Sequence, residues 1–192
     1  MLEKLLEYDK ELLIFLNNLG INDYDYMWGA LTQIKFWVPV YLLFFWMIWK
    51  TYRDNRLWFS MTMTLGLVSV SLLLTQLVKV SVGRIRPSNV EGLSSMLRVL
   101  FETQSFSFFS GHAANSFTLT TFVFLICRGK FPWAALLFIW PLLFSFSRIY
   151  VGVHYPSDIL MGVLTGVMLA YFGFRIHKGY YKRNELPYPG NG

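Results

Sequence analysis

Long apolar segments dominate this 192-residue sequence and limit what it can fold into. A helix needs about 20 mostly apolar residues to cross a bilayer, and its backbone must satisfy its own hydrogen bonds there. Windows of this kind lie at 28–49, 57–78, 113–127, 132–146 and 159–176. We therefore predict an all-α, polytopic transmembrane helix bundle with five spans, formed by a single domain over residues 1–192.

Composition favours a membrane protein over a soluble one. Hydrophobic residues make up 55% of the chain and aromatic residues 19%, which is high for a soluble domain of this length. The net charge of +6 would suit a nucleic-acid-binding protein. However, the basic residues form short clusters between apolar runs instead of one stripe. We expect the bilayer to be the main environment, with no nucleic acid and no obligate protein partner.

The first 20 residues have a different pattern from the five windows. Leucines alternate there with glutamate, aspartate and lysine at helical spacing. This pattern is typical of an amphipathic helix that lies in the membrane interface. We predict such a helix over residues 1–20, in place of a full span, and it can be counted as a sixth element.

Basic clusters give the orientation of the bundle. With five spans, the segments 50–56, 128–130 and 175–183 share one side, and they contain nine Lys and Arg residues. By the positive-inside rule this side is cytoplasmic. The chain is then expected in the cytoplasmic (inner) membrane, with its other end, including the 88–107 loop, on the periplasmic or extracellular side.

A second group of polar residues gathers at the predicted outer ends of the spans. Each one alone has an ordinary explanation, such as snorkelling or helix capping. Together they bring more positive charge to one place than the nearby carboxylates balance, which calls for an anion. The group consists of Lys79, Arg84, Arg86, His112, Arg148, His154 and Asp158.

Spacing in this group indicates a phosphoryl ligand. Lys79 and Arg86 are seven residues apart and share a face if one helix continues to Pro87. The small residues Ser110 and Gly111 stand where a span begins, and a helix N-terminus presents free N–H groups to phosphate.

A histidine and a carboxylate in the last motif suggest a nucleophile. Asp158 follows His154 by four residues, and Pro156 between them suits the first turn of a helix. The carboxylate can therefore reach the imidazole, fix its tautomer and strengthen it as a nucleophile.

Three segments resemble, in order and spacing, the signature motifs of the type 2 phosphatidic acid phosphatase family. They are KVSVGRIRP at 79–87, SGH at 110–112 and SRIYVGVHYPSD at 147–158. The family usually has a proline before the SGH triplet, where this chain has Phe109, and it usually has six full spans.

The resemblance implies a phosphatase that needs no metal or other cofactor and forms a phosphohistidine. It implies that His154 attacks phosphorus, Asp158 orients His154, and His112 protonates the departing oxygen. The residues implied to hold the phosphoryl oxygens are Lys79, Arg86, Ser110, Gly111 and Arg148. Arg84 is expected beside the site, next to one of its members or to a lipid headgroup.

The substrate is expected to be a lipid phosphate, because the site lies at an interface between apolar spans. Among lipids that relatives of this kind act on, we favour undecaprenyl diphosphate, with lipid A phosphates and phosphatidylglycerophosphate or phosphatidate as alternatives. A rival of another class is a non-catalytic anion or lipid transporter. The pairing of His154 with Asp158 beside a second histidine favours the enzyme, because binding alone needs no nucleophile.

Overall fold

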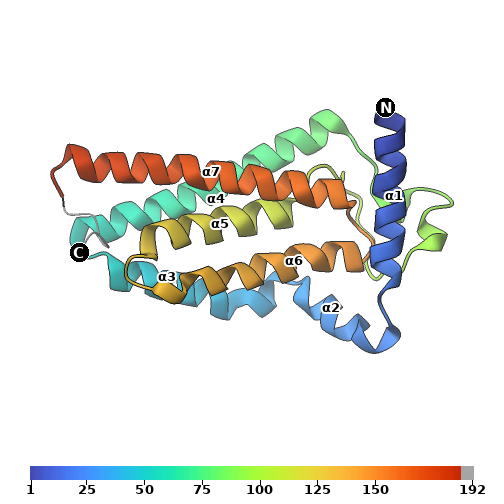
Figure 1. Cartoon of the computed structure of the whole chain (residues 1–192), viewed down its shortest axis with the longest axis horizontal. Coiled ribbons are helices and arrows are strands. Elements are labelled where there is room, and N and C mark those ends of the chain that lie inside the picture. The colour runs from blue at the N-terminus through green and yellow to red at the C-terminus, as the bar shows by residue number, and fades with distance from the viewer. Residues whose placement is uncertain (187–192) are drawn as a thin grey trace.

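The chain forms a helix bundle with one helix lying across its end. The computed structural model describes residues 1–186. In Figure 1, α3 (Val38–Thr51), α4 (Asp54–Val82), α5 (Gly111–Cys127), α6 (Ile139–Tyr150) and α7 (Pro156–Arg183) run along the long axis. The first helix, α1 (Leu2–Asn18), runs across one end of the bundle. Residues 1–186 contain no strand, so the all-α prediction is confirmed.

Shorter elements connect these helices. The helix α2 (Asp25–Leu31) lies between α1 and α3. The remaining elements are single 3-10 segments, namely η1 (Asn22–Tyr24), η2 (Ile34–Trp37), η3 (Pro87–Asn89), η4 (Ser94–Met96) and η5 (Pro132–Phe138).

Helix length and composition make this a membrane-spanning bundle. Three segments are long and apolar enough to cross a bilayer, namely Asp54–Asn89, Pro132–Tyr150 and Pro156–Arg183. A fourth span results if Asn22–Leu31 and Ile34–Thr51 count together, although a bend of 69° separates them. The remaining apolar helix, α5, has 17 residues.

The predicted span over 28–49 is not one continuous helix, because the chain breaks at Thr32 and Gln33. Gln33 has an extended backbone, with φ −93° and ψ 129°. Across the break, the indole N–H of Trp37 donates to the carbonyl of Leu31 at 2.7 Å. Pro39 lies in the first turn of α3, where proline is favoured because its missing N–H would have no partner there.

Close backbone contact between α5 and α7 forms the centre of the bundle. The two helices approach so closely that a Cβ at Gly162 would lie 2.6 Å from the carbonyl oxygen of Ser110. A Cβ at Gly166 would lie 2.5 Å from the carbonyl oxygen of Ala114. Small residues allow this approach, which is common between helices in membranes because dispersion contacts replace the hydrophobic drive.

The basic loops meet at the end of the bundle opposite α1. The Lys130 ammonium donates to the carbonyl oxygen of Lys50 at 2.5 Å, which joins the loops 50–56 and 128–130. The Tyr52 hydroxyl donates to the carbonyl of Ile126 at 2.8 Å, and its ring lies 5.8 Å from that of Tyr181 near the end of α7. The predicted grouping of these clusters at one end is therefore confirmed, whereas the side of the membrane stays a prediction.

One face of α1 is anchored to the bundle, and the adjacent face exposes apolar side chains. The Asn17 amide donates to the carbonyls of Ile149 and Tyr150 at 3.0 and 2.7 Å, and Leu13 is fully buried. An adjacent stripe of apolar side chains is exposed, as an interfacial helix requires. The stripe contains Leu5, Tyr8, Leu12, Phe15 and Leu19.

The α5–α7 contact yields a stability prediction. Replacing Gly166→Ala should destabilise the protein by about 1–3 kcal/mol, because the added methyl group overpacks a backbone contact. Gly179→Ala, on the same helix, is the matched control, since a Cβ there meets no atom within 4 Å. Thermal unfolding in detergent measures both. Equal melting temperatures for the two variants would contradict the close packing.

Candidate active site

The predicted site residues meet at the end of the bundle that α1 crosses. They come from the end of α4 and the loop after it, from the start of α5, from the end of α6, and from the start of α7. Segments far apart in the sequence therefore contribute to a single site.

A histidine and an aspartate form a buried pair at the start of α7. His154 Nδ1 lies 3.2 Å from Asp158 Oδ2, and their side chains are 1% and 0% exposed. The same oxygen accepts the backbone N–H of Tyr155, the N-cap residue of α7, at 3.0 Å. Because an ionised carboxylate only accepts, Nδ1 carries the proton of this bond. The lone pair of Nε2 then points away from Asp158, as a nucleophile requires.

Burial and neighbouring charges keep this imidazole neutral. Burial lowers the pKa of His154 well below its ordinary value of 6.5, and the cations Arg86, Arg148, Lys79 and Arg84 lower that pKa further. A neutral imidazole retains the lone pair that attack on phosphorus needs.

Arg86 reaches the site from a loop and not from a helix. The helix α4 ends at Val82, and Gly83 follows in the left-handed conformation with φ 63°. The prediction that Lys79 and Arg86 share a face of one helix is therefore wrong, because glycine takes this C-terminal position without strain. Even so, Arg86 Nη1 lies 3.2 Å from His154 Nε2.

Hydrogen bonds hold the Arg86 guanidinium in place. It donates to the carbonyl of Val153 at 3.0 Å and, through Nε, to the carbonyl of Ser105 at 2.7 Å. Since these partners are neutral, the positive charge of Arg86 has no carboxylate in direct contact within the described residues.

A second buried arginine has a donor without a partner. Arg148, in the last turn of α6, is 9% exposed, and its Nη1 donates to the hydroxyl of Thr32. Its Nε–H has no hydrogen-bond partner among the described residues. Buried donors are normally satisfied, so this group indicates a missing acceptor such as a phosphoryl oxygen.

The start of α5 lies next to the His154–Asp158 pair. Ser110 is the N-cap of this helix, and its hydroxyl accepts the N–H of Ala113 at 3.4 Å. Its own N–H donates to the backbone carbonyl of Asp158 at 3.0 Å, which joins the two motifs. The Gly111 N–H opens the first turn of α5, as predicted for a phosphate-binding turn.

His112, the second residue of α5, lines a cavity together with Lys79. Its ring lies 4.8 Å from that of Phe144. It also lies within electrostatic range of Arg148, His154 and Lys79. A bound phosphoryl group would offset these cations and allow His112 to hold the proton that a leaving oxygen needs.

The sequence placed Arg84 beside the site. It did not reveal Asp9, which contacts the same guanidinium as Asp158 does. Arg84 Nη1 donates to Asp158 Oδ1 at 2.8 Å, and its Nη2 donates to Asp9 Oδ2 at 2.7 Å. The guanidinium carbon lies 3.7 Å above the ring of Tyr155. Asp9 is one of several acidic residues on α1, and nothing in the sequence distinguishes it from the others.

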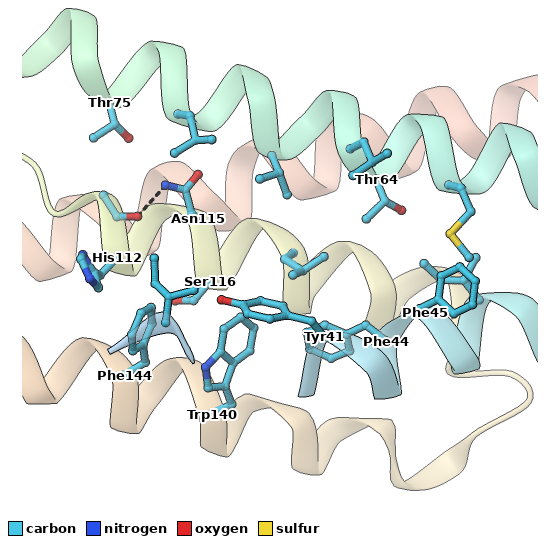
Figure 2. Close-up of a pocket in the computed structure, with 18 of the residues that line it drawn as sticks. Tyr41, Phe44, Phe45, Thr64, Thr75, His112, Asn115, Ser116, Trp140 and Phe144 are labelled. Atoms are coloured by element: carbon cyan, nitrogen blue, oxygen red, sulfur yellow. Dashed lines mark hydrogen bonds between the residues drawn. The ribbon is translucent and has the colours of Figure 1, made fainter. Parts of the chain in front are cut away.

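A cavity of about 750 Å³ runs from the site along the apolar helices. Figure 2 shows His112 at one end of this cavity and Phe45 towards the other. Lys79, Gly111 and His112 line it on the side of the site, and α3, α4, α5 and α6 supply a mostly apolar wall. Its wall includes Tyr41, Phe44, Phe45, Leu65, Val68, Leu72, Leu119, Trp140 and Phe144.

The donor set of the site is poor in metal ligands. In residues 1–186, no three His, Cys, Asp or Glu side chains form a group that could hold a metal ion. The carboxylate nearest the cations, Asp158, already accepts from His154, Tyr155 and Arg84.

Comparison with known proteins gives consistent matches. The family model described as the PAP2 superfamily matches residues 58–182. A lipid A 4'-phosphatase of Bacteroides thetaiotaomicron is 31% identical over 100% of this chain and 88% of its own length. An undecaprenyl-diphosphatase of Sulfolobus acidocaldarius is 29% identical over 73% of this chain and 63% of its own length.

A solved structure shares the fold. The crystal structure of a transmembrane PAP2 type phosphatidylglycerolphosphate phosphatase from Bacillus subtilis matches with a TM-score of 0.70 at 19% identity. The match covers 94% of this chain and 87% of that protein.

Proposed function

The chain belongs to the PAP2 superfamily, and we propose that it hydrolyses a lipid phosphate through a phosphohistidine at His154. The observation that carries the proposal is the buried pair of His154 and Asp158, with Nε2 directed at the arginine-rich pocket.

The reaction has two displacements at phosphorus. His154 Nε2 attacks, the bond from phosphorus to the lipid oxygen breaks, and His112 gives that oxygen its proton. Water then attacks the phosphohistidine, the P–N bond breaks, and His112 takes a proton from the water. Inorganic phosphate leaves, and both histidines return to their starting states.

Fixed cations take the place of a metal ion in this proposal. Lys79, Arg86 and Arg148 supply positive charge, and the Gly111 N–H adds a backbone dipole. Charge on the three equatorial oxygens of the transition state is stabilised by such preorganised groups. Asp158 stabilises the positive charge that develops on the imidazole of His154.

The cavity that has His112 at one end supports the proposal of a lipid substrate. Its apolar walls suit hydrocarbon, and its mouth is shared with Lys79 and His112. A phosphate bound among the cations can therefore keep its lipid tail among the helices. A transporter would need the cations and the cavity but not the His154–Asp158 pair.

Polar atoms near His112 bear on the choice of lipid. The amide nitrogen of Asn115 donates to the carbonyl of Gly111 at 2.8 Å, and because a carbonyl only accepts, Oδ1 faces away from it. This Oδ1 is buried without a partner among the described residues, and Asn115 lines the cavity. Thr75 nearby uses its hydroxyl hydrogen on the carbonyl of Ser71, which leaves another acceptor.

Two acceptors favour a substrate that brings donors. Lipid A is an acylated amino sugar and carries hydroxyl and amide N–H groups near its phosphate. A polyprenyl diphosphate brings only phosphate oxygens and hydrocarbon. We therefore place lipid A phosphate first, in line with the relative that matches the whole chain. Undecaprenyl diphosphate, which the sequence favoured, is the second candidate, in line with the archaeal relative.

Sidedness follows from the charges at the opposite end. The clusters 50–56, 128–130 and 175–183 lie away from the site, and the positive-inside rule places them in the cytoplasm. The proposed site then faces the periplasm or the exterior of the cytoplasmic membrane.

The first prediction concerns the nucleophile. His154→Ala should lower kcat by at least about 1000-fold, because it removes the group that forms the covalent intermediate.

The covalent intermediate can be trapped directly. Wild-type protein quenched during turnover with phosphate-labelled lipid should carry an acid-labile, base-stable label, with or without excess chelator. The variant should carry none while keeping its melting temperature. Turnover that stops in chelator and returns with magnesium would contradict the metal-free reaction.

The second prediction concerns the lipid. Phosphate release in detergent should give a higher kcat/KM for lipid A phosphate than for undecaprenyl diphosphate or phosphatidylglycerophosphate. Asn115→Leu should lower kcat/KM for lipid A phosphate about tenfold, which is the usual cost of one lost hydrogen bond. The same variant should change kcat/KM for undecaprenyl diphosphate less than about twofold. A higher kcat/KM for undecaprenyl diphosphate in the wild type would reverse the order of the two candidates.

The third prediction concerns topology. Single cysteines at the exposed positions Ser95 and Asn55 report the two ends of the bundle. In intact cells an impermeant thiol reagent should label Ser95→Cys but not Asn55→Cys, and both should react after permeabilisation. Cys127 is buried, so the parent chain is the blank. The opposite labelling would place the site in the cytoplasm.

A further inference from the structure

An acidic side chain of α1 contacts the catalytic pair through one arginine. Asp9 Oδ2 accepts Arg84 Nη2 at 2.7 Å, and Arg84 Nη1 donates to Asp158 Oδ1 at 2.8 Å. The other oxygen of Asp158 holds His154. The side chains of Asp9 and Arg84 are only 9% and 19% exposed, so the ion pair is weakly screened by solvent.

Asp9 also holds the first turn of α7. Its Oδ1 accepts the backbone N–H of Ser157 at 2.9 Å, and its Oδ2 accepts the Ser157 hydroxyl at 2.5 Å. Ser157 immediately precedes Asp158, and its N–H is one of the donors that a helix leaves unpaired at its start. One carboxylate from α1 thus fixes both the backbone beside Asp158 and the arginine in contact with it.

The position of Asp9 affects how much charge Asp158 can offer to His154. If Asp158 were the sole partner of Arg84, the arginine would neutralise that carboxylate. The attraction of Asp158 for the positive charge that develops on His154 in the transition state would then be weaker. With Asp9 on its other side, Arg84 shares its positive charge between two carboxylates. Asp158 then keeps more of its negative charge for His154, and this effect is felt when charge develops in the reaction.

We propose that Asp9 is a positioning residue for the catalytic pair, acting through Arg84, so that the N-terminal helix is part of the catalytic apparatus. This inference rests on the proposed phosphatase function. Loss of Asp9 should affect kcat more than substrate binding, because Arg84 and Asp158 separate Asp9 from the proposed phosphate-binding cations.

The helix α1 keeps a second anchor when Asp9 is changed. Asn17 donates to three backbone carbonyls, of Arg98, Ile149 and Tyr150, and its Oδ1 accepts the N–H of Arg98 at 2.6 Å. Leu13 is buried between the two anchors. A variant at Asp9 is therefore expected to keep α1 in place.

The test compares two acidic residues on one helix. Asp9→Asn should lower kcat about tenfold, a loss typical of one charge-assisted hydrogen bond, while KM changes less than about twofold. Glu11→Gln removes the same charge from an exposed position of α1 and should leave kcat within about twofold of wild type. Asp9→Glu, which keeps the charge, should recover most of kcat. If Asp9→Asn kept wild-type kcat, or if Asp9→Glu were as slow as Asp9→Asn, the inference would be overturned.

A double-mutant cycle identifies the route. If Asp9 acts through Arg84, the double variant Asp9→Asn/Arg84→Gln should be no slower than Arg84→Gln alone. Additive losses in kcat would overturn that route. Absence of phosphate release by the wild type from every lipid in the panel would refute the proposed function itself, and the inference with it. If the wild type released phosphate and Asp9→Asn had the same kcat, this inference would be refuted and the proposed function would stand.

Discussion

The site depends on the buried carboxylate of Asp158. Taking a carboxylate out of water costs several kcal/mol unless hydrogen bonds and charges compensate for it. Here the compensation comes from His154, the Tyr155 N–H and Arg84. The backbone carbonyl of the same residue accepts the Ser110 N–H at the start of α5. The contacts of this one residue therefore fix the positions of His154, the Ser110 turn and the loop after α4 relative to one another.

The cations near this carboxylate are balanced only in part. Arg86 donates to neutral oxygens, and Arg148 retains an N–H without a partner among residues 1–186. A phosphoryl group would satisfy both arginines at once, and its charge is concentrated on the oxygens they would contact. In the proposed reaction, the positive charge that the fold leaves uncompensated would stabilise the bound phosphoryl group. The close contact of α5 with α7 at Gly162 and Gly166 holds the Ser110 turn beside the start of α7.

The sequence predicted the membrane bundle and the identity of the residues that meet, because apolar length and motif spacing are local properties. It did not predict how they meet. Seven-residue spacing suggested one helix for Lys79 and Arg86, but Gly83 ends α4 and Arg86 approaches from a loop. Thr32, which bonds to Arg148, lies beside the break at Gln33, which the apolar window 28–49 did not reveal. Asp9 was not identified because its partners lie about 75 and 148 residues away, and such contacts leave no periodic signal.

The positions of the two histidines are consistent with an in-line displacement. His112 lines the cavity that suits a lipid tail, whereas His154 lies outside its lining. A phosphoryl group held between them by Arg86, Arg148 and Lys79 would have its lipid oxygen on the side of His112 and His154 Nε2 on the other side. In-line transfer requires that arrangement, with the attacking and leaving atoms on opposite faces of phosphorus. In this proposal, the same separation gives a reason why His154 is paired with a buried aspartate. As the proposed nucleophile, His154 would gain positive charge away from water, whereas His112, as the proposed acid, would act at the edge of the cavity.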